Sequence, residues 1–160
     1  MFTNDYNNSI IKYAEVKCVL AVFKNVKWKV NQRMIKLIVD SACDINSDIT
    51  ENYDIEVIPL SITIDGISYL DGIDIDIDTV YNHMRNGKVP KTSQVSFESV
   101  SKAFDKCVSS NYDFIYLAFS SKLSGTYDFS KKIIDNYKEK YLERKMAIIH
   151  SKGAAVGNGL

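Results

Sequence analysis

Two polar segments of this chain carry hydroxyl groups at positions suited to binding a ligand. Residues 91–94 read Lys-Thr-Ser-Gln, and residues 120–126 read Ser-Ser-Lys-Leu-Ser-Gly-Thr directly after an apolar stretch. In open α/β sheets, ligands bind at the carboxyl ends of the strands, where hydroxyls and free helix amides satisfy an anionic oxygen. Either segment is therefore a candidate anion-binding loop. Hydroxyl-rich loops also form ordinary caps and turns, and the residues alone leave both interpretations open.

Catalysis and metal binding find little support elsewhere in the sequence. A serine hydrolase needs a base beside its nucleophile, but His83 and His150 lie in a predicted helix and at a predicted strand end, and no Gly-x-Ser-x-Gly motif occurs. Asp74, Asp76 and Asp78 have the spacing of the first ligands of a calcium loop, but the glycine and the glutamate required later in that loop are absent. We therefore predict no catalytic residue, no metal site and no cofactor. The aspartates are better interpreted as a solvated helix start.

The composition argues against nucleic-acid and membrane partners. The formal net charge is +0, and no stretch approaches the ~20 apolar residues of a membrane-spanning helix. Cys18, Cys43 and Cys107 are an odd number without a CxxC spacing, so neither a disulfide framework nor a zinc site is indicated. We expect a cytoplasmic protein that binds no nucleic acid and does not insert stably into a membrane.

The first 33 residues differ from the rest of the chain. They contain six basic and two acidic side chains, a net charge of +4, and show only weak apolar periodicity. The pattern changes abruptly after Met34, where a sharp apolar run begins. We predict that residues 1–33 are an extension of the folded domain. This extension is either a helix or strand docked on the domain, a disordered segment or a non-native leader. Residues 34–160 are predicted to form the folded domain.

The two hydroxyl segments must be positioned by an alternation of strands and helices. This pattern is typical of an α/β fold with a mixed, mainly parallel sheet covered by helices. Asp65 and Gly66 predict a tight hairpin turn, Gly87 is suited to end a helix, and Asn46 or Ser47 is suited to cap one. The predicted strands are residues 36–39, 56–64, 67–70, 113–119 and 145–149, and the predicted helices are residues 47–53, 76–85, 96–109 and a segment starting near 125.

In order and spacing, the motifs of this domain resemble those of the DegV family of fatty-acid-binding proteins. The resemblance covers nearly all of residues 34–160 and is most specific in the two hydroxyl segments. The motifs are Asp-Ser at 40–41, Ile-Pro-Leu at 58–60, the hairpin at 65–66, Asp-Gly with Asp-Ile at 71–75, residues 91–94, residues 121–126, and Ser-Lys at 151–152 followed by Gly157 and Gly159.

The resemblance implies a lipid carrier and not an enzyme. Family members are two-lobed proteins that bury a long-chain fatty acid in an apolar tunnel and bind its carboxylate with hydroxyls from these two segments. Thr92 and Ser124 match the carboxylate-binding positions, and Ser93 and Gly125 match supporting positions. In Gram-positive bacteria, family members present the fatty acid to a separate fatty-acid kinase, which phosphorylates the carboxylate. The resemblance thus implies a bacterial carrier with a kinase subunit as its partner.

The chain departs from the family pattern in length and at two positions. The match is to the N-terminal lobe and stops at Leu160, before a second lobe that supplies half of the tunnel and a histidine that helps to hold the carboxylate. His150 replaces a usual aspartate, which we expect to alter a turn, and Val95 replaces a frequent proline, which we expect to be a mild change. A truncated fragment that binds no lipid, unfolded or serving only as an interaction fragment, is the alternative to a functional carrier.

Deletion of residues 1–33 tests the domain boundary. We expect a protein that begins at Met34 to unfold cooperatively, with a urea midpoint close to that of the full chain, because the α/β pattern and all the motifs lie after that residue. If only the full chain unfolded cooperatively, the leader would be structural and the boundary would be wrong.

Overall fold

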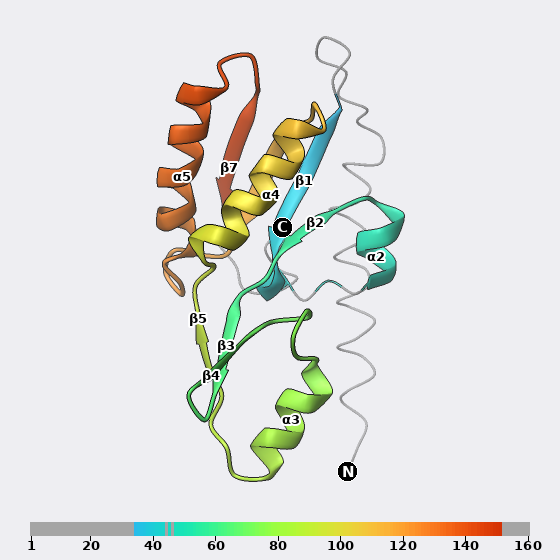
Figure 1. Ribbon diagram of the computed structural model, residues 1–160, viewed down its shortest axis with the longest axis vertical. Helices are drawn as coiled ribbons and strands as arrows, with labels where there is room; N and C mark the ends of the chain where they lie inside the picture. The colour runs from blue at the N-terminus through green and yellow to red at the C-terminus, as the bar shows by residue number, and fades with distance from the viewer. Residues whose placement is uncertain (1–33, 44, 46, 152–160) are drawn as a thin grey trace.

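The computed structural model describes residues 34–43, 45 and 47–151, so the extension predicted for residues 1–33 lies outside the described residues. The described chain forms two β-sheets and the helices around them (Figure 1). The elements in chain order are β1 (Ile35–Asp40), the 3-10 helix η1 (Ser41–Cys43), α2 (Ser47–Asn52), β2 (Glu56–Ile58), β3 (Ser61–Ile64), β4 (Ile67–Leu70), α3 (Ile77–Arg85), β5 (Lys91–Ser93), α4 (Phe97–Ser109), β6 (Asp113–Ala118), α5 (Thr126–Lys140) and β7 (Met146–His150).

A four-stranded parallel sheet in the order β2-β1-β6-β7 is the centre of the fold. β1 and β6 pair over five residues, from Ile35 opposite Asp113 to Val39 opposite Leu117. Parallel strands need crossover connections, and α4 and α5 supply two of them (Figure 1). The α/β class, the mainly parallel sheet and the covering helices are confirmed.

Side chains from both faces of the parallel sheet are buried. Successive side chains of a strand point to opposite faces, so Ile38 and Val39 enter different clusters. Ile38 packs in the larger cluster with Phe104 of α4 and Ile134 of α5, whereas Val39 packs with Cys43 on the other face. A strand buried on both faces is read in the sequence as a continuous apolar run, which is why β1 was recognisable. None of the helices in the described ranges is long and apolar enough to cross a membrane.

The single strand predicted for residues 56–64 is wrong. The chain divides at Pro59 and Leu60 into β2, which pairs with β1, and β3, which belongs to the other sheet. Proline has no amide proton to donate to a strand ladder, so pairing is interrupted there. The Leu60 amide instead donates to Ser41 Oγ at 3.0 Å, which fixes the crossing between the sheets against the end of β1.

The second sheet is antiparallel, in the order β4-β3-β5. The predicted hairpin joins β3 to β4, with Ile64 opposite Ile67. Asp65 has φ 52° and Gly66 has φ 82°. Two positive φ angles are what a primed hairpin turn requires, so the predicted turn is confirmed.

β5 is a strand where the sequence predicts only a polar loop. Its three residues are all exposed and pair with β3 only, so β5 is an edge strand. An edge strand without a buried face has no alternation of apolar and polar side chains, so its sequence carries no strand signal.

Helix ends follow the predicted capping chemistry. Asp76 Oδ1 accepts from the Thr79 amide at 2.7 Å, which makes Asp76 the N-cap of α3 and confirms the acidic run as a helix start. Gly87 follows α3 with φ 79°, the left-handed conformation that ends many helices. Of the caps proposed for α2, Asn46 lies outside the described residues, and Ser47 is the first helical residue.

Asp40 joins the ends of β1 and β6. Its side chain is fully buried, and its Oδ2 accepts from the Phe119 amide at 2.7 Å and from the Tyr116 hydroxyl at 3.4 Å. Burial disfavours the charged form and raises the pKa of Asp40 to about 6, although the bond from Phe119 opposes this shift.

The raised pKa makes stability depend on pH. Because the folded pKa lies above the ordinary value of 3.8, the contribution of Asp40 to stability is fully present below pH 3.8 and is lost as the pH rises through about 6. Between pH 4.5 and 7.5, we expect the free energy of unfolding of the wild-type chain to fall by about 2 kcal/mol more than that of Asp40→Asn, which does not titrate. Urea unfolding at a series of pH values measures this difference. A difference that stayed constant over this range would show that Asp40 is not a buried titrating acid.

Candidate functional site

The two hydroxyl segments lie at the junction of the two sheets. Residues 91–94 include β5 and lead into α4, and residues 120–126 connect the carboxyl end of β6 to α5 (Figure 1). The second segment therefore occupies the position at which open α/β sheets bind ligands. The antiparallel sheet brings the first segment to this end of the parallel sheet.

Thr92 and Ser93 occupy opposite faces of the antiparallel sheet. Thr92 pairs with Ile62 of β3, and Ser93 pairs with Ser61. Because side chains alternate along a strand, the two hydroxyls point to different sides. A single ligand can therefore meet one of these hydroxyls, and the other residue can support the site only through its backbone.

Ser124 sits in a tight turn before α5. The amides of Leu123 and Ser124 both donate to the carbonyl of Ser120, at 2.9 and 3.0 Å. The Thr126 amide donates to Ser124 Oγ at 3.2 Å, and the hydroxyls of Ser124 and Thr126 are 2.9 Å apart. The Ser124 hydroxyl is thus held in place by the first residue of α5.

Gln94 and Gly125 bring the two segments into contact. A Cβ atom at position 125 would lie 2.3 Å from Gln94 Oε1, closer than real Cβ contacts occur. The φ of Gly125 is −72°, which any residue can adopt, so the backbone conformation does not require a glycine here, and a side chain at this position would displace the end of the Gln94 side chain. Gln94 is two residues from Thr92 and Gly125 is next to Ser124, and two residues span at most ~7 Å of chain. The predicted site residues therefore come from segments that touch.

His150 tethers the loop that carries Ser124. The Ser121 amide donates to His150 Nε2 at 3.0 Å, and Ser121 Oγ lies 2.9 Å from the same nitrogen. The imidazole ring also packs against Tyr127 of α5, with ring centroids 4.9 Å apart. The residue at the end of β7 thus fixes the start of the loop at the end of β6.

The sequence by itself predicts no role in this site for Gln94, Thr126 or His150. The contact of Gln94 with Gly125 has no signal in the sequence, because glycine is itself a common N-cap residue, and α5 has Gly125 there with no side-chain cap.

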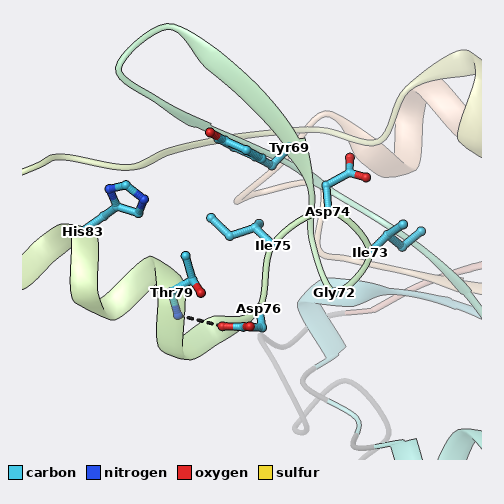
Figure 2. Close-up of a pocket in the computed structure, with 8 residues that line it drawn as sticks. All are labelled: Tyr69, Gly72, Ile73, Asp74, Ile75, Asp76, Thr79 and His83. Atoms are coloured by element: carbon cyan, nitrogen blue, oxygen red, sulfur yellow. Dashed lines mark hydrogen bonds between the residues drawn. The ribbon is translucent and has the colours of Figure 1, made fainter.

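A pocket lies apart from the two hydroxyl segments, between β4, the loop after it and α3 (Figure 2). This pocket has a volume of about 260 Å³. Its carboxylates are engaged with the backbone, since Asp74 Oδ2 accepts from the Leu70 amide at 2.9 Å and Asp76 caps α3. Within the described ranges, no group of three or more His, Cys, Asp or Glu side chains is arranged to hold a metal ion. The lining residues are Tyr69, Gly72, Ile73, Asp74, Ile75, Asp76, Thr79 and His83.

The chemistry of the hydroxyl segments suits an anionic oxygen. Thr92 and Ser124 offer neutral O–H donors, and the start of α5 adds the positive end of a helix dipole. Lys91 and Lys122 are exposed next to them and add positive charge at the surface. A carboxylate or a phosphate oxygen matches these donors.

Comparison with known proteins identifies the family of this domain. A family model described as an uncharacterised protein of the DegV family matches residues 34–160. A DegV domain-containing protein of Clostridium perfringens is 36% identical over 126 residues, which cover 78% of this chain and 43% of that protein. A DegV domain-containing protein of Caldanaerobacter subterraneus is 36% identical over 129 residues, covering 79% and 44%. The chain therefore spans less than half the length of these relatives.

Solved structures agree with these matches. A structure described as a fat acid (stearic acid)-binding protein from Eubacterium ventriosum has a TM-score of 0.74 and 31% identity, over 79% of this chain and 44% of that one. A DegV lipid-binding protein from Thermotoga maritima has a TM-score of 0.61 and 33% identity, over 76% and 43%. Since the family model covers residues 34–160 and these folds superpose on the described domain, the chain belongs to the DegV family.

Proposed function

We propose that this domain binds a long-chain fatty acid through its carboxylate, with Thr92 and Ser124 as the hydroxyl donors. The contact between Gln94 and Gly125 carries the proposal, because it joins two segments that are far apart in the sequence and belong to different sheets. Solved relatives are described as binding fatty acids, one of them stearic acid, which supports the choice of ligand.

The charge and the shape of a carboxylate both match the donors of this site. Each carboxylate oxygen accepts several hydrogen bonds, and bonds to a charged acceptor are about twice as strong as neutral ones. Thr92 on β5 and Ser124 before α5 approach from different elements, so they can bind different sides of one carboxylate. Ser93 and Gly125 would support them, Gly125 by admitting Gln94 and by placing backbone amides near the ligand.

The acyl chain needs an apolar enclosure that the full-length relatives are long enough to provide. This chain spans 43% to 44% of those proteins, so we infer that a complete tunnel involves residues beyond those matched here. In the whole protein we propose a role as a cytoplasmic carrier that presents its fatty acid to a fatty-acid kinase. Catalysis would then belong to the kinase, and this domain would contribute binding only.

Alanine substitutions test the hydroxyl donors. The test protein is a hybrid in which this chain replaces the matching segment of the full-length Clostridium perfringens relative. We expect Thr92→Ala and Ser124→Ala each to weaken stearate binding by about 1 to 3 kcal/mol, because a buried carboxylate oxygen loses its donor. Binding of radiolabelled stearate and urea unfolding measure affinity and stability on the same proteins.

Thr63→Ala is the matched control for these variants. Thr63 is a hydroxyl residue of β3 that pairs with Lys91, and its Oγ1 lies 3.1 Å from the hydroxyl of Ser68. Because Thr92 pairs with Ile62, the side chain of Thr63 lies on the opposite face of the antiparallel sheet from that of Thr92. Its removal should leave stearate affinity unchanged. Unchanged affinity in the Thr92 and Ser124 variants, with a large loss of stability in both, would assign the two hydroxyls to structure.

The polypeptide of residues 1–160 alone is expected to bind stearate weakly or not at all. Each methylene removed from water contributes ~0.8 kcal/mol to the free energy of binding, and an incomplete tunnel leaves many methylenes exposed to water. Two hydroxyl contacts of about 1 kcal/mol each do not compensate. The apolar side chains exposed along α3 and the loop before it, Ile73, Ile77, Tyr81 and Met84, should instead promote self-association.

Native mass spectrometry of this polypeptide distinguishes the possibilities. We expect lipid-free monomers and small oligomers. A monomer that carried one stoichiometric fatty acid would show that residues 1–160 suffice for binding. Failure of the hybrid to bind stearate would favour the alternative that this segment is an interaction fragment without lipid.

A further inference from the structure

The hydroxyl of Thr126 is buried beside the hydroxyl of Ser124. Thr126 is the first residue of α5, and its side chain is fully buried. Its Oγ1 lies 2.9 Å from Ser124 Oγ, and no other hydrogen bond to this hydroxyl occurs in the part of the chain that the structure describes. The Thr126 amide donates to the same Ser124 oxygen at 3.2 Å. Two polar groups of one residue therefore converge on Ser124 Oγ.

The direction of the hydroxyl contact follows from the burial of Thr126. If Ser124 donated to Thr126, the Thr126 proton would be buried without an acceptor, which costs about 1 to 3 kcal/mol. If Thr126 donates to Ser124, the proton of Thr126 has an acceptor, and only the lone pairs of Thr126 Oγ1 remain without a donor. The second arrangement is therefore favoured.

In that arrangement Ser124 can act only as a donor. A serine hydroxyl has two acceptor lone pairs and one proton. The amide and the hydroxyl of Thr126 occupy the lone pairs, so the remaining interaction of Ser124 is donation of its proton away from Thr126. Ser124 is only partly buried, so that proton can reach a ligand.

We propose that Thr126 is a positioning residue that orients the proton of Ser124 toward the carboxylate of the bound fatty acid. The proposal rests on the proposed function of Ser124. It adds to the site a residue that does not contact the ligand. It also explains why the hydroxyl of a neutral serine would donate its proton to an anion. Polarisation along the pair also strengthens the outer hydrogen bond, since each bond in a chain reinforces the next.

Two substitutions distinguish the effect of the Thr126 hydroxyl from the effect of its side-chain volume. Thr126→Val keeps the branched shape and removes the hydroxyl, and Thr126→Ser keeps the hydroxyl and removes a methyl group. In the hybrid protein we expect Thr126→Val to weaken radiolabelled stearate binding by about 3- to 10-fold, the equivalent of one net hydrogen bond. Thr126→Ser should bind within about 2-fold of the unsubstituted hybrid, because the donor to Ser124 is retained.

A double-mutant cycle with Ser124→Ala tests whether Thr126 acts through Ser124. With no serine hydroxyl to orient, Thr126→Val should cause no further loss of affinity. An equal loss in both backgrounds, or weak binding by Thr126→Ser, would assign Thr126 to packing and overturn the proposal. If Ser124→Ala alone leaves affinity unchanged, the proposed function of Ser124 fails. If Ser124→Ala weakens binding and Thr126→Val does not, only the role of Thr126 fails.

Discussion

The hydrogen bond from the Phe119 amide to the buried carboxyl of Asp40 is the contact on which the candidate site depends. It joins the carboxyl ends of β1 and β6, and the loop that carries Ser124 begins one residue later. The raised pKa of Asp40 reflects the cost of burying this group. The next residue, Ser41, accepts from the Leu60 amide and fixes the crossing into the second sheet. The end of β1 thus contacts both segments that lead to the site, the one after β6 and the one that crosses into the antiparallel sheet.

The site exists because two sheets meet there. The parallel sheet supplies Ser124 at the end of β6, and the antiparallel sheet supplies Thr92 on an edge strand. Neither sheet alone would bring hydroxyls from two directions to the proposed ligand. Gln94 packs closely on Gly125 where the two segments meet, and a side chain at position 125 would displace the end of Gln94.

The proposed recognition of a carboxylate relies on oriented neutral donors. A buried cation would bind an anion more strongly but would be costly to desolvate in the empty protein. Hydroxyls avoid that cost if their protons are already directed at the ligand, because binding then requires no reorganisation. The contacts of Ser124 with Thr126, and of Ser121 with His150, hold the loop in one arrangement.

The sequence by itself determined the α/β class, the hairpin at Asp65, the helix starts, and the family, because apolar periodicity, turn residues and ordered motifs are local properties of the chain. It did not reveal the break at Pro59 that separates the two sheets, nor β5, whose exposed residues have no periodic pattern. Only the tertiary structure decided that Gln94 meets Gly125 and that His150 holds Ser121. The two residues of each pair are about 30 positions apart in the sequence. The packing of separate strands brings them together, and no local sequence pattern predicts that packing.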